Sequence, residues 1–144
     1  MKYLIQSATI IDPTSKYHLK QMDILIENGI ISSIKKSIPV DGTKSIHAKN
    51  LHISKGWVDL KANFQDPGFE YKEDIESGSK ASASGGFTKV CISPLTSPAI
   101  DSKSQVDYII NKSKNNLVDI LPYACISKSA LGKELAELHD MHQS

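Results

Sequence analysis

The sequence predicts an α/β protein in two parts, a β-rich part over residues 1–54 and an alternating strand and helix part over residues 55–144. The first part consists of β-branched runs broken by turn residues, which is typical of short strands. The second alternates short apolar runs with helical patterns, which is typical of βα units around a parallel sheet. A chain of 144 residues allows one domain of ordinary size or two small ones.

The first part is expected to form a small sheet. Its strands are predicted at residues 3–11, 22–27, 30–38, 45–48 and 51–53. Asn28-Gly29 separates the second strand from the third, and this dipeptide is the strongest two-residue hairpin signal. So few short strands cannot cover both faces of a sheet, so we expect part of a β-sandwich that strands from elsewhere complete.

The second part is expected to contain three strand and helix units. Strands are predicted at 57–60, 87–92 and 118–126, and helices at 73–84, after a cap at Asp101, and at 132–142. Val106, Ile109 and Ile110 form the apolar stripe of the second helix, and Leu131, Leu135 and Leu138 are expected to face inward from the third. Three units in about 90 residues is the density of a TIM (β/α)8 barrel, which needs about 250 residues to close. The prediction is therefore the first three units of an incomplete barrel with open sheet edges, as in a fragment, a truncated product or a piece that assembles with another chain.

Composition excludes several function classes. With 40% hydrophobic and 23% charged residues the chain has a globular composition, and a net charge of +1 gives no field that would attract nucleic acid or an anionic membrane. No signal peptide or long apolar run is present, so we expect a soluble, cytoplasmic protein. Cys91 and Cys125 lie in apolar segments and are predicted to be buried free thiols in a reducing compartment.

One segment carries a family resemblance. Residues 56–68 read Gly-Trp-Val-Asp-Leu-Lys-Ala-Asn-Phe-Gln-Asp-Pro-Gly. This resembles the first barrel strand of dihydroorotases and related cyclic amidohydrolases, which reads Gly-x-x-Asp-x-His-x-His-x-Arg-(Glu/Asp)-Pro-Gly. Further segments resemble the family in the same order, at residues 26–31, 71–74, 83–88, 93–98 and 132–137. The chain is thus similar to the N-terminal portion of a dihydroorotase.

The resemblance implies zinc-assisted opening of a cyclic amide. This chain differs from the family pattern at the positions that bind the metal and the substrate. The two metal-binding histidines are replaced by Lys61 and Asn63. A protonated Lys has no lone pair to offer, and an Asn carbonyl is a poor zinc ligand. The Arg and Asn that bind substrate in the family correspond to Gln65 and Leu95. We therefore assign no metal, no cofactor and no catalytic residue to this chain, although zinc is the cofactor of the family.

Two functions follow from the resemblance. The first is a dihydroorotase-like protein of pyrimidine biosynthesis that is catalytically defective and has a binding or assembly role. Its partner would be another pyrimidine-pathway enzyme, such as aspartate transcarbamoylase, or a second copy that self-associates through the open edges. The alternative is an active cyclic amidohydrolase whose altered metal site is completed by later strands, with Asp59 or Asp66 assisting. Lys61 would then either bind an anion with its fixed charge, or be a relaxed position that pairs with Asp59 or Asp66 or reaches water.

Overall fold

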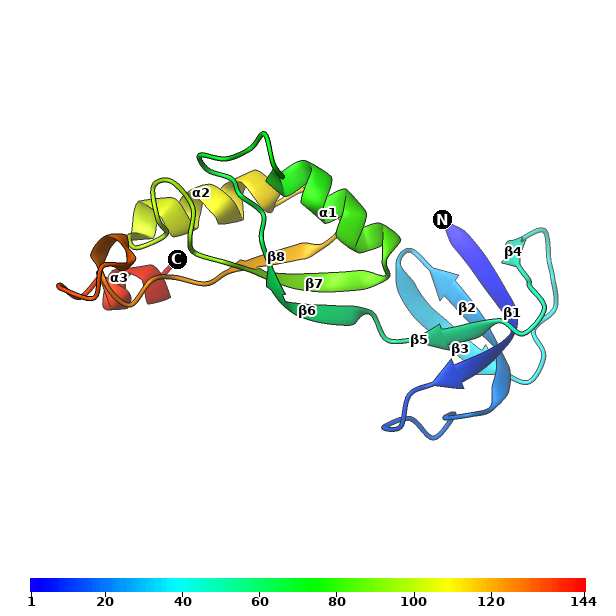
Figure 1. Ribbon diagram of the computed structural model, residues 1–144. Helices are drawn as coiled ribbons and strands as arrows, with labels where there is room; N and C mark the ends of the chain where they lie inside the picture. The colour runs from blue at the N-terminus through cyan, green and yellow to red at the C-terminus, as the bar shows by residue number, and fades with distance from the viewer. The chain divides into compact units, whose positions relative to one another are not determined.

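The chain forms two compact units. The computed structural model describes residues 1–144, and the units are Met1–Lys55 and Gly56–Ser144. Figure 1 shows the first unit as strands and loops, and the second as strands accompanied by helices. None of the helices has the length and apolar character needed to cross a lipid bilayer.

The first unit is a five-stranded sheet built around its longest strand. β1 (Lys2–Ile11) pairs antiparallel with β2 (Gln21–Glu27) and parallel with β4 (Lys44–Ile46) and β5 (His52–Ser54). β3 (Ile30–Lys35) pairs with β2 across the Asn28-Gly29 turn, so the predicted hairpin is confirmed. Both turn residues have positive φ, at 52° and 81°, as this tight turn requires.

The third strand of the first unit is shorter than predicted, because a backbone N–H beyond its end bonds to a side chain and not to the neighbouring strand. The prediction ran to residue 38, but β3 ends at Lys35. The backbone N–H of Ile38 donates instead to the buried carboxylate of Asp23, at 2.9 Å. The other oxygen of Asp23 accepts the N–H of Ser7 at 2.8 Å, so one carboxylate ties the strand end to the bulge in β1.

The first unit has an apolar groove of about 200 Å³ on its sheet. Five isoleucines contribute to its lining, namely Ile10, Ile24, Ile31, Ile34 and Ile53. The ion pair between Lys55 and Asp12, at 3.1 Å, lies at the same groove. This unit therefore presents apolar side chains to solvent.

The second unit is a three-stranded parallel sheet with helices on one face. The strand order is β6 (Trp57–Ala62), β7 (Phe87–Ile92) and β8 (Asp119–Pro122), and the helices are α1 (Ile75–Ser84) and α2 (Lys103–Ser113). The predicted strand 87–92 is confirmed at both ends. The alternating strand and helix pattern thus predicted the α/β class correctly.

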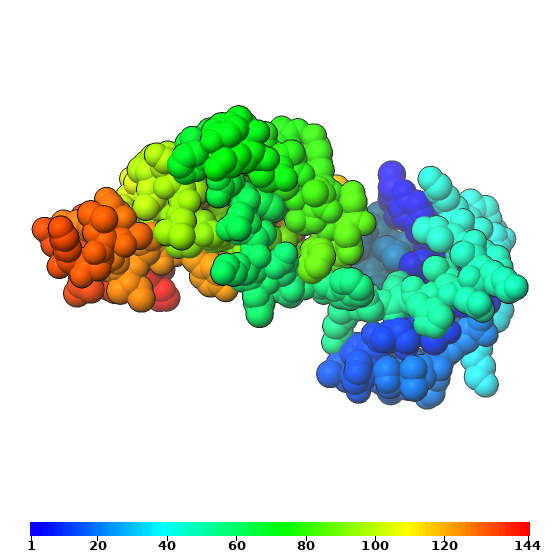
Figure 2. Space-filling view, viewed as in Figure 1, coloured from blue at the N-terminus to red at the C-terminus, as the bar shows by residue number.

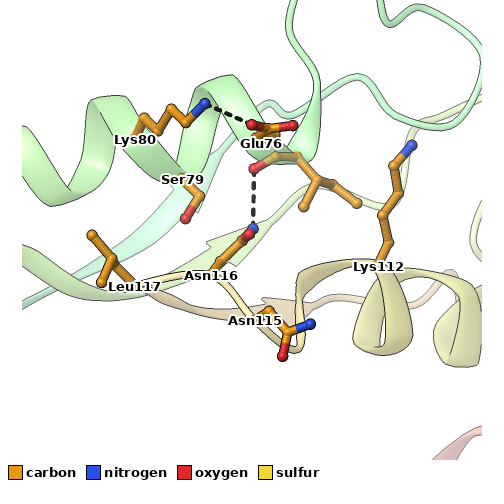
Figure 3. A pocket seen from close by; sticks show the side chains of 8 residues that line it. Glu76, Ser79, Lys80, Lys112, Asn115, Asn116 and Leu117 are labelled. Atoms are coloured by element: carbon orange, nitrogen blue, oxygen red, sulfur yellow. Dashed lines mark hydrogen bonds and ion pairs between the residues drawn. The ribbon is translucent and has the colours of Figure 1, made fainter.

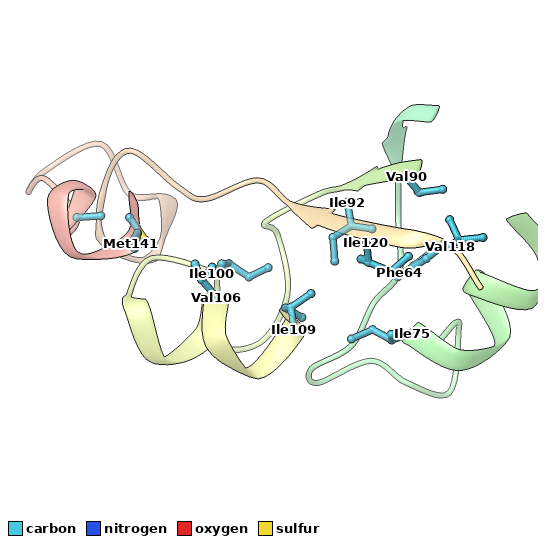
Figure 4. Close-up of a cluster of buried hydrophobic side chains, with 11 residues drawn as sticks. Phe64, Ile75, Val90, Ile92, Ile100, Val106, Ile109, Val118, Ile120 and Met141 are labelled. Carbon is cyan, nitrogen blue, oxygen red and sulfur yellow. The ribbon is translucent and has the colours of Figure 1, made fainter. Parts of the chain in front are cut away.

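The core of the second unit lies between the sheet and the helices. Val90, Ile92 and Ile120 point from the strands toward Ile75 of α1 and Ile109 of α2 (Figure 4). The whole cluster comprises Phe64, Ile75, Val90, Ile92, Ile100, Val106, Ile109, Val118, Ile120, Ala136 and Met141. The opposite face of the sheet has no such layer, because both long helices pack on the same side.

A capping box begins α1. Asp74 is the N-cap residue, and its carboxylate accepts the N–H of Ser77 at 2.7 Å while the Ser77 hydroxyl accepts the N–H of Asp74 at 3.3 Å. These bonds satisfy backbone groups that the first helical turn leaves open. The helix thus begins two residues later than the predicted residue 73.

The predicted cap of α2 was wrong by one residue. Ser102 is the N-cap, and the Gln105 side chain accepts its N–H at 2.9 Å. Asp101 instead accepts the N–H of Ser129 at 2.6 Å, so its carboxylate holds a distant turn. Ile110 is also partly exposed, and the buried positions of the helix are Val106, Ile109 and Ser113.

The predicted third helix, 132–142, is mostly wrong. Only α3 (Leu138–His142) and the short 3-10 turn η1 (Lys128–Ala130) are helical. Gly132 has a φ of 69°, and Glu134 accepts the backbone N–H of Lys128 at 2.9 Å, so the chain closes a loop here. Figure 2 shows this orange-coloured segment standing out from the helices of the second unit.

The apolar side chains of that segment do not face inward as predicted. Leu131, Leu135 and Leu138 are all exposed, whereas Ala136 and Met141 are buried. The third strand of this sheet is also shorter than the predicted 118–126, because β8 ends at Pro122. The N–H of Tyr123 still donates to the Ile92 carbonyl at 3.0 Å, but the N–H of Cys125 donates to the Ile100 carbonyl at 2.7 Å, so the chain leaves β7 there. The second unit therefore leaves a large apolar surface uncovered.

Candidate functional site

The candidate site lies where β6 ends. Ala62 is half-buried and Phe64 is buried in the helix-side core, whereas Lys61 and Asn63 are exposed. Because successive side chains of an extended segment alternate between faces, Lys61 and Asn63 share the face opposite the helices. The two residues thus stand side by side on that face, as two metal-binding histidines at this spacing would.

The Lys61 ammonium makes no ion pair. The backbone N–H of Lys61 donates to the carboxylate of Asp59 at 2.9 Å, and this is the contact that joins the two residues. Asp66 has a different lysine, Lys112, as its partner. The predicted pairing of Lys61 with Asp59 or Asp66 is therefore not observed, and the ammonium faces water.

Asp66 is a buried anchor between the loop after β6 and the helices. It is fully buried, and its carboxylate accepts the Tyr108 hydroxyl at 2.8 Å, the Lys112 ammonium at 2.7 Å and the Ile75 N–H at 3.3 Å. Burial by itself lowers the pKa of Lys112, but the hydrogen bonds with Asp66 and Tyr108 outweigh it, so the pKa is raised. All donors to Asp66 thus come from α1 and α2, which fixes the loop that follows β6.

Sequence reasoning missed Tyr108 and Lys112. They lie four residues apart on α2, a spacing that places both side chains on one side of a helix. That spacing was visible in the sequence, but nothing in the sequence connects it with a carboxylate more than forty residues earlier. The contact arises only from the packing of α2 beside the loop.

Two loops meet at the same end of the sheet. Gln65 belongs to the loop after β6, where its N–H donates to the Glu73 carbonyl at 3.0 Å. Leu95 is exposed in the loop after β7, and that loop begins with the N–H of Ser93 donating to the Ala62 carbonyl at 2.9 Å. A Cβ on Gly68 would come within 2.1 Å of the Ser97 carbonyl oxygen, so this glycine lets the loops touch.

These residues do not fit a zinc ion. The positions at the end of β6 carry an ammonium and a carboxamide, and neither is a ligand that zinc prefers. No group of three His, Cys, Asp or Glu side chains in the chain is arranged to hold a metal. Gln65 and Leu95 likewise offer no positive charge for an anionic substrate.

The two cysteines are buried and free, as predicted. Burial and the charge of Asp101 raise the pKa of the Cys125 thiol, which opposes formation of the reactive thiolate. Cys91 raises the pKa of Tyr123, whose hydroxyl donates to the Leu60 carbonyl at 3.1 Å. Nothing around either sulfur activates it as a nucleophile.

A separate cavity lies on the helix side of the second unit. Its volume is about 320 Å³, and Figure 3 shows α1 on one side of it and the turn after α2 on the other. Lys80 pairs with Glu76 at 2.6 Å, and the Asn116 amide donates to the Ile75 carbonyl at 3.5 Å. Lys80 and Glu76 thus neutralise each other, and Lys112, the third charged residue of the lining, pairs with Asp66. None of the residues at the end of β6 lines this cavity.

Comparison with known proteins identifies the family. The sequence model of a family described as Dihydro-orotase-like matches residues 51–144. A dihydroorotase of Citrifermentans bemidjiense is 40% identical over 146 residues, covering 100% of this chain and 34% of the relative. The dihydroorotase of Aquifex aeolicus is 39% identical, with the same coverage of both chains. The chain thus spans about a third of the length of the curated relatives that it matches.

Solved structures agree with this assignment at the level of the fold. L-hydantoinase from Arthrobacter aurescens has a TM-score of 0.78 at 20% identity, over 98% of this chain and 30% of that one. A D-hydantoinase has a TM-score of 0.73 at 26% identity, over 99% and 29%. The predicted resemblance is therefore confirmed, and the chain belongs to the dihydroorotase-like family of amidohydrolases.

Proposed function

We propose that this chain is a dihydroorotase-like scaffold of pyrimidine biosynthesis that has lost the ring-opening activity and retains a binding or assembly role. The observation that carries the proposal is the pair Lys61 and Asn63 on one exposed face at the end of β6. They occupy the positions at which the family pattern has its two histidines. Replacement of both removes two imidazole ligands from a metal that polarises the amide and activates water.

The surroundings of the site support the same proposal. Gln65 and Leu95 stand where the family has an Arg and an Asn that bind substrate. A charge-assisted hydrogen bond is worth about 1.5–3 kcal/mol, and a leucine side chain replaces none of it. Asp66 cannot readily serve as a substitute base, because Tyr108, Lys112 and the Ile75 N–H occupy its oxygens. Asp66, Pro67 and Gly68 still match the family pattern in the loop after β6, which favours a scaffold that has been retained.

The finer description of the fold belongs to the same proposal. β6, β7 and β8 with their helices are the first three units of a (β/α)8 barrel, and the first unit is part of a β-sandwich. The parallel order and the helices on one face support the barrel, and the isoleucine groove supports a second sheet. A cytoplasmic pyrimidine-pathway enzyme, such as aspartate transcarbamoylase, or a second copy of the chain is the partner class that the family resemblance favours.

The test is metal content and turnover in the longest form of the protein isolated from its source. We expect zinc near zero per chain by elemental analysis, and dihydroorotate ring opening at the background rate with zinc added. The double variant Lys61→His/Asn63→His should bind zinc, because two imidazoles two residues apart reach one metal. Lys61→Gln/Asn63→Gln is the matched control, since it removes the charge without adding ligands.

A tightly held metal in the unmodified protein would contradict the proposal. Metal-dependent turnover would do so even more directly, and would establish an active hydrolase whose site is completed by later strands. Asp59 would then be the residue to replace first, since one of its oxygens accepts only a backbone N–H.

A further inference from the structure

The cavity between α1 and the turn after α2 is formed by this chain alone. Every residue of its lining belongs to α1, to the last turn of α2 or to the turn that follows. The Asn116 amide ties that turn to α1 by donating to the Ile75 carbonyl at 3.5 Å, and the backbone N–H of Asn116 donates to the Ser113 carbonyl at 2.9 Å. Both walls of the cavity are therefore held in place before any ligand binds.

Ser79 places a buried hydroxyl in this cavity. The residue is 3% exposed, and its hydroxyl has no hydrogen-bond partner within the chain. Serine hydroxyls on helices can bond to the carbonyl four residues earlier, as Ser82 does to Gly78 at 2.8 Å. For Ser79 that carbonyl belongs to Ile75, which accepts the Asn116 amide instead. No side-chain polar atom that is sealed from solvent lacks a partner in this protein, so the Ser79 hydroxyl is open to the cavity and free to bond a ligand there.

The charges around the cavity are already paired. The Lys80 ammonium lies 2.6 Å from the Glu76 carboxylate, and the Lys112 ammonium lies 2.7 Å from that of Asp66. Figure 3 shows both ammonium groups directed away from the Ser79 hydroxyl. A charged ligand group beside Ser79 would lose water without gaining a partner of opposite charge. The cavity therefore favours an uncharged ligand.

Apolar side chains supply the other contacts. Ile75 is 1% exposed on α1, whereas Leu117 is 88% exposed on the turn. The volume of about 320 Å³ is near the lower end of the range of about 300–1,000 Å³ that is typical of small-molecule sites. A ligand of this size needs an apolar body for Ile75 and Leu117, and a tip that donates or accepts a hydrogen bond at Ser79. A phenol has both in one rigid group, and the tyrosine side chain is its form in proteins.

We propose that this cavity binds an uncharged phenol, whether a tyrosine side chain of a partner protein or a small aromatic alcohol. The ring contacts Ile75 and Leu117, and its hydroxyl bonds to the Ser79 hydroxyl. The Asn115 carboxamide, which lines the same cavity and has no partner within the chain, offers a second hydrogen bond. This inference goes beyond the proposed scaffold role and is independent of the residues at the end of β6, because none of them lines the cavity.

Saturation-transfer difference NMR with p-cresol, the analogue of the tyrosine side chain, tests the proposal on the longest form of the protein. We expect p-cresol to bind more tightly than toluene, which has the same ring and methyl group without the hydroxyl. Ser79→Ala should weaken p-cresol binding by about threefold to tenfold, the contribution of one hydrogen bond, and leave toluene binding unchanged. Ser84→Ala is the matched control, because it is the same substitution on the same helix and the Ser84 hydroxyl already donates to the Lys80 carbonyl, at 2.9 Å.

A second ligand distinguishes the two sources of the phenol. N-acetyl-tyrosine amide carries the tyrosine side chain on an uncharged piece of backbone. If it displaces p-cresol, the cavity accepts a tyrosine of a partner protein. If p-cresol binds and is not displaced, the cavity is assigned to a small aromatic alcohol.

Three results would overturn the proposal, once circular dichroism has established that each variant folds. Absence of p-cresol binding would remove the site. Equal affinity for p-cresol and toluene, or unchanged p-cresol affinity in Ser79→Ala, would show that the buried hydroxyl takes no part in recognition. Tighter binding of benzoate than of p-cresol would contradict an uncharged ligand. None of these results depends on zinc, so the proposed loss of the metal site is tested separately.

Discussion

Replacement of Asp66 by asparagine should destabilise the second unit, because all three partners of this buried carboxylate are hydrogen-bond donors. Asparagine keeps one acceptor oxygen and turns an NH2 group toward donors. The variant therefore loses the charge, loses at least one bond and introduces a donor facing a donor. The loop after β6 would lose its tie to both helices.

The magnitude follows from the exposure of the partners. A hydrogen bond to a charged group contributes about 1.5–3 kcal/mol, and breaking a fully buried ion pair costs about 3–5 kcal/mol. Lys112 and Tyr108 are each about 40% exposed, so water can solvate them again, whereas the Ile75 N–H stays buried. We therefore expect the free energy of unfolding to fall by about 2–3 kcal/mol, at or below the lower end of the range for a fully buried ion pair.

Urea unfolding followed by tryptophan fluorescence is the assay. Trp57 is the single tryptophan, and it lies against Phe87 in an edge-on contact with ring centroids 6.0 Å apart, so its emission reports on the parallel sheet. With a slope of about 1–3 kcal/mol per molar urea, the midpoint should fall by about 0.7–3 M. Lys80→Gln, which removes an exposed ion pair of α1, should leave the midpoint nearly unchanged. An Asp66→Asn midpoint equal to that control would refute the reasoning.

Three further predictions concern the same unit. Gly78→Ala should lower the free energy of unfolding by about 1–2 kcal/mol, because the new Cβ would lie 2.5 Å from the buried Phe64 ring. Ser84→Ala, at an exposed position of the same helix, is the control in the same urea unfolding experiment. Asp74→Ala should lower the urea midpoint, and because hydrogen bonds from Ser77 lower the pKa of Asp74, the difference from the unaltered chain should persist at neutral pH and vanish only as pH falls below the ordinary aspartate range. Hydrogen bonds with Asp66 and Tyr108 raise the pKa of Lys112 despite its burial, so its stabilising contribution is complete below its ordinary pKa of about 10.4 and is lost only as pH rises above that. The stability difference between the unaltered chain and Lys112→Met should accordingly be constant from about pH 6 to about pH 9, and a steady decline in that interval would contradict the assignment.

Local signals in the sequence predicted the parts of the fold that local physics decides. Asn28-Gly29 fixed the first hairpin, since few other dipeptides adopt two positive φ angles without strain. The run 87–92 was placed correctly because glycines precede it and the apolar run is bounded. The sequence also determined the composition of the site, because the replacement of two histidines by Lys61 and Asn63 can be read without a structure.

Other features depended on tertiary contacts. The pattern Leu131, Leu135 and Leu138 has helical spacing, yet the loop closed by Gly132 and the Ser127–Leu135 bridge overrides it. Asp101 has the chemistry of a helix cap, yet its carboxylate is taken by Ser129. In both places a partner distant in sequence competes with the local preference, and periodicity carries no information about such a partner.

The sequence by itself thus determined the α/β class, the family and the loss of the two imidazole ligands, because these depend on residue type and spacing along one strand. Only the tertiary structure decided the role of Asp66 and the isolation of the Lys61 charge. A carboxylate near a site can act as a base, a ligand or an anchor, and its partners decide among these. For Asp66 those partners are Tyr108 and Lys112, which the packing of α2 brings to it from more than forty residues away.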